Sequence, residues 1–183
     1  DTIKRYKTNH LEKYRYPSGD PLHFLLARRL IEAGAPIVHF SLGYWDWHGE
    51  NFIAGRQQIP MFDNALAALL TDLDGRGRPD TTMGLGLGEM GRKPKCGTEK
   101  NAGRDHWSFG YSVLFAGAGI RGGTIHGATD AHAAYVKSHP VSISDICATI
   151  YHLLGIDPDM KVYDNDRPVA VAHGGRPIAE LLA

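Results

Sequence analysis

The sequence predicts an α/β fold in which helices alternate with the strands of a mostly parallel sheet. Short apolar runs bounded by glycine or proline, typical of buried strands, occur at residues 36–42, 81–87 and 111–116. Between and after these runs, apolar residues recur at helical spacing. At 183 residues the chain is long enough for one domain with a real core. With no internal repeat or clear linker, we expect a single domain over residues 1–183.

Two helices are expected in the first half of the chain. Asp20 and Pro21 form a typical helix start, with a capping carboxylate followed by proline at the first helical position. Gly34 is the expected C-terminal cap of this helix. A second helix is expected over 59–75, where Pro60 suits the first turn.

The second half predicts one further long helix. Ser142 and Asp145 have capping-box spacing ahead of an apolar-periodic segment that ends at Gly155. Residues 157–167 are polar and predict a loop, and residues 177–182 predict a last helical turn.

Three short stretches combine glycines with carboxylates, imidazoles and guanidiniums, namely residues 43–51, 88–92 and 103–107. The strand–helix–strand unit expected over residues 37–88 would be a right-handed crossover whose two parallel strands end at the same edge of the sheet. Ligands of open α/β sheets bind at this edge. We therefore expect the three stretches to meet at one site.

The first stretch offers two metal ligands. Asp46 and His48 are two residues apart, so in extended backbone their side chains point to the same side and could reach one cation. Glu89, just past the second strand, is a third candidate ligand. Carboxylate and imidazole together suit zinc, manganese or iron. Alternatively, the alternation of this pair with Trp45 and Trp47 describes a two-faced strand without a metal.

The other stretches add a second carboxylate–imidazole pair and two guanidiniums. Asp105 and His106 could ligate a metal, or the carboxylate could simply orient the imidazole. Arg92 and Arg104 could clamp a phosphate or sulfate in the fork geometry of arginine. A structural salt bridge between Glu89 and Arg92 is the alternative.

Bulk composition excludes several classes of function. The chain has 20 Lys and Arg and 20 Asp and Glu, so it lacks the global basic field of a nucleic-acid-binding protein. Its two cysteines match no zinc spacing, and no apolar run approaches the length that spans a bilayer. The locally basic first sixteen residues indicate a solvated leader. Because the chain starts at Asp and opens in the middle of a pattern, we expect a fragment or a processed chain.

Taken together, the motifs resemble the DUF1501 family, a bacterial family of uncharacterised proteins that is similar to the alkaline phosphatase and sulfatase superfamily. The resemblance covers nearly the whole chain. Its main motifs are Trp45-Asp46-x-His48-Gly49-x-Asn51-Phe52, Gly88-Glu89-Met90-Gly91-Arg92-Lys93-Pro94, Gly103-Arg104-Asp105-His106-Trp107 and Asp145-Ile146-x-Ala148-Thr149-Ile150-Tyr151.

The resemblance implies an alkaline-phosphatase-like three-layer α/β sandwich that is incomplete at its N-terminus, with a two-metal site. Asp46, His48 and His106 would share one metal. The Asp-His pair that holds the second metal in the superfamily is replaced here by Glu89 and Met90. Glutamate can ligate a hard cation, whereas methionine cannot replace histidine there.

A second assignment gives Asp105 and His106 to the second metal, and the distal ligand of the first metal is then His132 or His126. The metal would be divalent, zinc first, with manganese, calcium or iron as alternatives. The resemblance also implies an exported protein, since fuller family members often carry a twin-arginine leader.

The favoured function is metal-dependent hydrolysis of a phosphate or sulfate ester of a small molecule or carbohydrate. Arg92 and Arg104 would bind the non-bridging oxygens, and Asp105 would ligate the metal or orient His106. The alternative is a non-catalytic binding or scaffold protein of the same fold. Met90 in a ligand position favours it, as does the absence, upstream of Asp46, of a Ser or Thr in the setting that the superfamily uses for its nucleophile.

Overall fold

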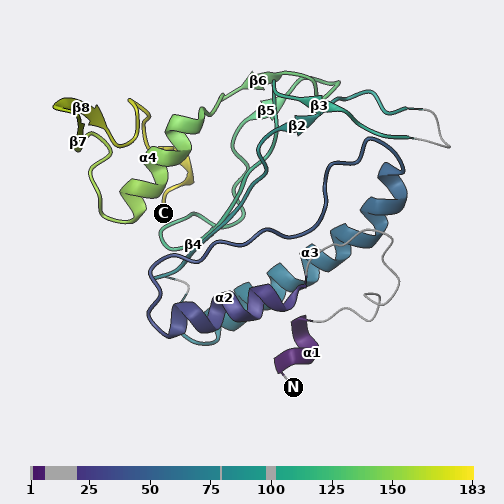
Figure 1. Ribbon diagram of the computed structural model, residues 1–183, viewed down its shortest axis with the longest axis horizontal. Coiled ribbons are helices and arrows are strands. Elements are labelled where there is room, and N and C mark those ends of the chain that lie inside the picture. Colours follow the sequence, from purple (N-terminus) through teal and green to yellow (C-terminus); the bar gives the residue numbers. More distant parts are fainter. Residues whose placement is uncertain (1, 7–19, 79, 98–101) are drawn as a thin grey trace. The chain divides into compact units, whose positions relative to one another are not determined.

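The computed structural model describes residues 2–6, 20–78, 80–97 and 102–183 (Figure 1). The chain divides into two compact units. Unit 1 comprises Asp1–Thr82 and Met90–Ser108, and unit 2 comprises Met83–Glu89 and Phe109–Ala183. Of the basic leader expected over the first sixteen residues, only residues 2–6 are described, and residues 7–16 lie outside the described residues.

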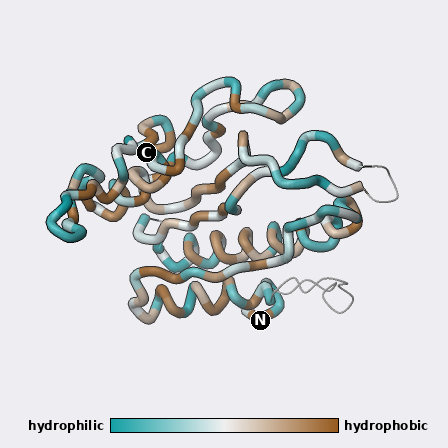
Figure 2. Tube along the Cα trace, turned by 45° about the horizontal axis from the view of Figure 1, so that its top comes forward, coloured by the Kyte–Doolittle hydropathy of each residue, from teal (hydrophilic) through white to brown (hydrophobic). Residues whose placement is uncertain are grey.

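Unit 1 is a helical layer that carries one short hairpin. Its helices are α1 (Thr2–Tyr6), α2 (Leu22–Glu32) and α3 (Asn51–Asp74), and its strands are β2 (Gly91–Arg92) and β3 (His106–Trp107). The hydropathy colouring of Figure 2 shows apolar positions recurring along α2 and α3. The core forms where all three helices meet, around Tyr6, Phe24, Leu25 and Ala65.

Helix α2 begins and ends where the sequence predicts. The Leu22 N–H donates to Asp20 Oδ1 at 2.9 Å, so the carboxylate satisfies one of the free donors of the first turn. At the other end Gly34 has φ +95°, and the Ala35 N–H donates to the Leu30 carbonyl at 2.9 Å. This left-handed residue closes the helix as glycine caps do.

Helix α3 starts earlier than the pattern predicts. It begins at Asn51 rather than near residue 59, and Pro60 lies inside it rather than in its first turn. Proline removes one helical hydrogen bond, a cost that tertiary packing of the first turns can offset. Ala54 and Gln58, both buried, lie on those turns.

Residues 36–42, expected as a strand, pair with no strand in the part of the chain that the structure describes. Their apolar alternation has a different role, because Phe40 and Leu42 pack against the helical core. A strand also needs a ladder partner, which a local pattern cannot supply. The strand–helix–strand unit is therefore not formed among the described residues, and the mostly parallel sandwich stays a prediction.

Unit 2 contains three antiparallel strand pairs and one long helix. The pairs are β1 (Met83–Gly86) with β4 (Leu114–Gly117), β5 (Ala128–Thr129) with β6 (Val136–Ser138), and β7 (Lys161–Asp164) with β8 (Arg167–Ala170). The helix is α4 (Ile143–Leu153), and a 3₁₀ turn at Ala179–Leu181 matches the expected last helical turn. The strand expected at 81–87 is shortened to β1, and the one expected at 111–116 starts later, at Leu114, and extends to Gly117. The two strands pair antiparallel, whereas mostly parallel strands were expected from the sequence.

The polar stretch 157–167 contains the turn of a hairpin and is not simply a loop. Asn165 and Asp166 have φ of 47° and 62° and connect β7 to β8. Two consecutive residues with positive φ make the type I′ turn that matches the twist of a hairpin, and Asn and Asp tolerate that conformation. The β7–β8 register then runs from Lys161 opposite Ala170 to Asp164 opposite Arg167.

Helix α4 confirms the predicted capping box. The Asp145 N–H donates to Ser142 Oγ at 3.1 Å, and the Ser142 N–H donates to Asp145 Oδ2 at 2.9 Å. Asp145 Oδ1 also accepts from the Arg176 N–H at 2.9 Å. None of the described helices is long and apolar enough to cross a membrane.

Candidate metal centre

The site lies in unit 1, where the loop after residue 42 meets the β2–β3 hairpin. Gln58 of α3, 1% exposed, accepts from the Tyr44 N–H at 2.9 Å and donates to the Tyr44 carbonyl at 3.0 Å. Gly43 has φ +80°, and a Cβ there would lie 2.7 Å from Gln58 Oε1. The loop is therefore fastened to α3 directly before the candidate ligands.

The two tryptophans of the loop pack against the helix. The ring centroids of Trp45 and Trp47 are 5.2 Å apart, and Trp45 meets the ring of Phe62 edge-on at 6.1 Å. The Trp47 ring lies so close to Gly55 that a Cβ there would be 3.3 Å from it. The alternation seen in the sequence therefore separates aromatic side chains that anchor the loop from polar side chains that form the site.

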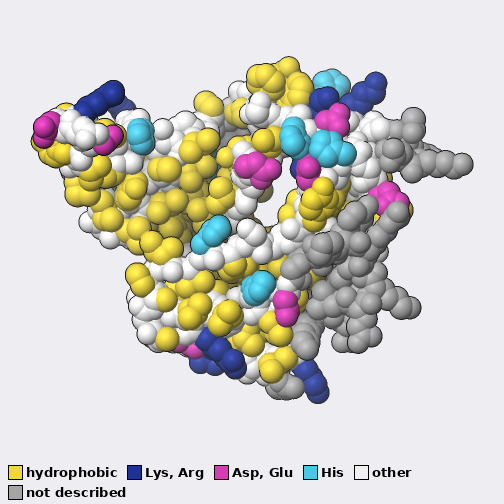
Figure 3. Space-filling model, in the orientation of Figure 1, with side chains coloured by type: hydrophobic (Ala, Val, Ile, Leu, Met, Phe, Trp, Pro, Cys, Tyr) yellow, Lys and Arg dark blue, Asp and Glu magenta, His cyan; other side chains and the backbone are white. Residues whose placement is uncertain are grey.

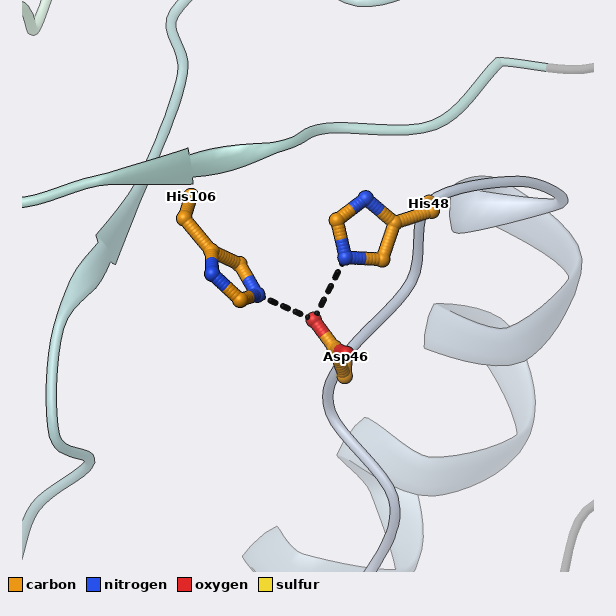
Figure 4. Close-up of side chains that lie close together, drawn as sticks. All are labelled: Asp46, His48 and His106. Carbon is orange, nitrogen blue, oxygen red and sulfur yellow. Dashed lines mark hydrogen bonds and ion pairs between the residues drawn. The ribbon is translucent and has the colours of Figure 1, made fainter.

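Asp46, His48 and His106 meet at a single oxygen (Figure 4). Asp46 Oδ1 lies 2.9 Å from His48 Nε2 and 2.7 Å from His106 Nε2. One potential ligand atom from each residue lies within 4.8 Å of the others. In the space-filling view, histidine, acidic and basic side chains gather near the position of β2 and β3 (Figure 3).

A second set of charged groups surrounds this cluster. Arg92 Nη1 lies 2.6 Å from Asp46 Oδ1. Asp105 Oδ1 lies 2.9 Å from His48 Nδ1, and Asp105 Oδ2 lies 3.1 Å from Lys93 Nζ. Asp105 thus pairs with His48 and not with its chain neighbour His106.

These partners favour the ionised form of both carboxylates. Hydrogen bonding from His106, and then from Arg92, lowers the pKa of Asp46 to about 2. The pKa of Asp105 is also lowered, mainly by its hydrogen bond to His48 and then by Lys93. An ionised carboxylate between two imidazoles is a competent ligand set for a cation.

Backbone contacts bring the hairpin to the loop. In the β2–β3 ladder Arg92 lies opposite His106, and the Arg104 N–H donates to the Trp47 carbonyl at 2.9 Å. At Gly103 an added Cβ would lie 1.8 Å from the His48 carbonyl oxygen. Only glycine permits this approach, which places His106 beside Asp46.

The two arginines expected to clamp an anion differ in their surroundings. Arg104 Nε donates to the Lys93 carbonyl at 2.6 Å, and Arg104 Nη2 donates to the Arg92 carbonyl at 3.3 Å. Arg104 therefore braces the hairpin through main-chain acceptors. Arg92, whose side chain is 20% exposed, contacts Asp46 directly.

Three other expected ligands belong to unit 2. Glu89 belongs to unit 2, so its role as a ligand stays a prediction. His132 and His126 also lie in unit 2, where the ring of His126 is 5.3 Å from that of His139. Among the described residues, the group whose ligand atoms lie close enough together to hold one metal ion is Asp46, His48 and His106.

Sequence reasoning did not assign Lys93 or Gln58 to the site. Lys93 follows Arg92 directly, and its ammonium group reaches the carboxylate of Asp105. The signal for Gln58 is a polar residue on the buried face of α3, between Ala54 and Met61, because a polar side chain in that position requires a hydrogen-bond partner.

The residues present fit a divalent metal. One carboxylate and two imidazoles form the ligand set of several catalytic zinc sites, which keep a further position for water or substrate. The bond from Asp105 to the far nitrogen of His48 matches the carboxylate–histidine support that metal-bound imidazoles usually have. Arg92 shares Asp46 Oδ1 with the imidazoles, and carboxylate oxygens accept several such bonds.

The comparisons with known proteins identify a family. The DUF1501 family, described as a protein of unknown function, matches residues 3–182. Comparison with curated proteins and with solved structures gave no match.

Proposed function

Because the chain belongs to the DUF1501 family, whose description names no reaction, we propose a function from the site itself. The protein is a metal-dependent hydrolase of phosphate or sulfate esters, with small molecules or carbohydrates as the esterified group. The observation that carries the proposal is the convergence of Asp46, His48 and His106 beside Arg92. The proposal includes the alkaline-phosphatase-like sandwich and membership of that superfamily.

Asp46, His48 and His106 would hold the metal, with zinc the best match and manganese, calcium or iron as alternatives. When bound, the metal polarises the ester and lowers the pKa of a bound water. A second metal, with Glu89 or the Asp105–His106 pair as its ligands, stays a prediction.

The chain's own cations determine which substrates suit the site. Arg92 provides a guanidinium that can bind two oxygens of one anion. Lys93 adds a half-exposed ammonium group on the other side of Asp105. A guanidinium beside the metal ligands, with an ammonium group beside Asp105, favours a substrate with several non-bridging oxygens, which phosphate and sulfate esters have.

The alternative function is a non-catalytic binding or scaffold protein, and one observation favours it. The charged groups of the cluster already pair with each other, Arg92 with Asp46 and Lys93 with Asp105. Such a network could fasten the loop to the hairpin without any chemistry.

The test compares the wild-type protein, purified without chelator, with an Asp46→Ala/His48→Ala double variant. We expect metal in the wild type by elemental analysis, loss of that metal in the double variant, and metal-dependent hydrolysis of nitrophenyl phosphate or sulfate. Equal metal in the two proteins would overturn the metal site. Metal without turnover of any ester in the panel would support the scaffold function instead.

Asp74→Asn is a matched control for the loss of a carboxylate. Asp74 is exposed at the end of α3, about 34 Å along the helix axis from the first residue of α3. This variant should keep the metal content and the activity of the wild type.

A further inference from the structure

The two imidazoles of the cluster are held differently. His48 has a partner at each ring nitrogen, with Asp46 Oδ1 2.9 Å from Nε2 and Asp105 Oδ1 2.9 Å from Nδ1. For His106 the structure gives a hydrogen bond at Nε2. Both rings are about half exposed, with 48% and 49% of the side-chain surface accessible, so packing alone does not fix them.

We propose that Asp105 is a positioning residue that sets the orientation of His48 and its ring proton, and that it is not a metal ligand. A carboxylate on Nδ1 holds the proton there and leaves the lone pair of Nε2 for a cation. This inference rests on the proposed metal site. It replaces the expectations that Asp105 ligates the metal or orients His106.

The contacts of Asp105 explain why it supports His48 and is not itself a metal ligand. Its Oδ1 is directed to the nitrogen of His48 that is remote from Asp46, and its Oδ2 to Lys93 Nζ at 3.1 Å. The Lys93 N–H also donates to the Asp105 carbonyl at 2.8 Å. Asp105 is thus fixed by Lys93 on one side and fixes His48 on the other.

The backbone around Gly103 makes this support possible. The segment that leads into β3 approaches the loop so closely that a Cβ on Gly103 would overlap the His48 carbonyl, and the Arg104 N–H donates to the Trp47 carbonyl. The residue that follows Arg104 is thereby placed beside the His48 ring. Local backbone contacts therefore link the position of Asp105 to that of the ligand it supports.

The decisive experiment is a double-mutant cycle on zinc affinity, measured by competition with a chromophoric chelator. Loss of a carboxylate that supports a metal-bound imidazole costs about 10- to 100-fold in affinity, so Asp105→Ala should lower zinc affinity by that factor. Asp105→Asn, which keeps an acceptor for the Nδ1 proton, should lose less. In a His48→Ala background, Asp105→Ala should have almost no further effect, because the residue acts through His48.

A full 10- to 100-fold further loss in the His48→Ala background would overturn the proposal, because Asp105 would then contact the metal or support the fold by another route. Asp74→Asn is again the control and should leave zinc affinity unchanged.

Two measurements distinguish failure of the proposed metal site from failure of the proposed role of Asp105. If the wild type binds no zinc, the metal site is wrong, and nitrogen-15 NMR of the His48 ring still tests the positioning. We expect a protected Nδ1 proton in the wild type and its loss in Asp105→Ala. The same protected proton in both proteins would overturn the role of Asp105.

Discussion

Arg92 and Arg104 each donate to the other's main-chain carbonyl. Arg92 Nη1 lies 3.2 Å from the Arg104 oxygen, and Arg104 Nη2 lies 3.3 Å from the Arg92 oxygen. These two hydrogen bonds link the two strands of the hairpin, but the two side chains differ in their other contacts. Arg92 also contacts Asp46, whereas Arg104 Nε donates to the Lys93 carbonyl.

The first prediction follows from this asymmetry. Arg92→Ala should weaken binding of inorganic phosphate to the metal-loaded protein by about tenfold or more, since bonds to a charged group contribute roughly 1.5–3 kcal/mol. Arg104→Ala should leave phosphate affinity within about threefold and lower stability by about 1 kcal/mol, through the lost bonds to carbonyls. Calorimetric titration and denaturant unfolding measure the two effects. The reverse pattern would show that Arg104 is the anion ligand.

The second prediction concerns Gly103. A Cβ at this position would lie 1.8 Å from the His48 oxygen, so Gly103→Ala must push the segment before β3 away from the loop. We expect loss of zinc binding and a fall in unfolding free energy of about 1–3 kcal/mol, the usual range for overpacking. Gly122→Ala is the control, because a Cβ there meets nothing within 4 Å. Wild-type zinc affinity in Gly103→Ala would contradict the close approach.

The helix ends were predictable because their causes are local. Asp20 accepts from a backbone N–H two residues later, and Ser142 and Asp145 exchange bonds three residues apart. The start of α3 was not predictable in this way, because its first turns pack through Gln58 onto Tyr44. The segment 36–42 shows the same limit, because its apolar residues contact the helical core and find no ladder partner among the described residues.

The sequence predicted which residues gather at the candidate site, but it did not predict which of their side chains contact each other. Spacing indicated that Asp46 and His48 face one way, and the resemblance indicated His106 as a ligand of the same metal. The structure brings the three side chains together, and the metal itself stays a proposal. The partner of Asp105 was not predicted, because it depends on the backbone approach at Gly103, which spacing does not encode. The expectation that Glu89 joins the site rested on a parallel sheet, and it stays a prediction.

The third prediction tests how the loop is fastened. Gln58→Leu removes both hydrogen bonds to the backbone of Tyr44, which should lower the free energy of unfolding by about 1–3 kcal/mol. Zinc affinity should fall as well, because the loop carries Asp46. Gln57→Leu, next to it on the partly exposed side of α3, is the control. Equal unfolding free energies for the two variants would show that the contact does not stabilise the loop.

The fourth prediction is a pH dependence in unit 2. The pKa of Asp145 is lowered, first by the Arg176 N–H and then by the Ser142 side chain. A carboxylate with a lowered pKa in the folded state contributes stability that is fully present above its unfolded pKa of about 4 and is lost as pH falls through the folded value.

We therefore expect the melting temperature to drop on acidification below pH 4, with a smaller drop in Asp145→Asn. Asp159→Asn, which alters an exposed carboxylate, should keep the full drop. An identical acid dependence in Asp145→Asn and the wild type would contradict the assignment.

The last prediction decides between the two histidines that the resemblance offers as the third ligand. His106 Nε2 lies 2.7 Å from Asp46 Oδ1, on the oxygen that also receives His48. His132 lies in unit 2, where its backbone N–H donates to Asp130 Oδ1 at 3.1 Å. We therefore expect His106 to be the third ligand. Mutation of a residue that supports a metal ligand lowers metal affinity by about 10- to 100-fold. Because loss of a direct ligand should lower it at least as much, we expect His106→Ala to lower zinc affinity by more than that factor. His132→Ala should leave it unchanged. A large loss in His132→Ala with none in His106→Ala would move the third ligand to the other unit and leave the 2.7 Å contact as an ordinary ion pair.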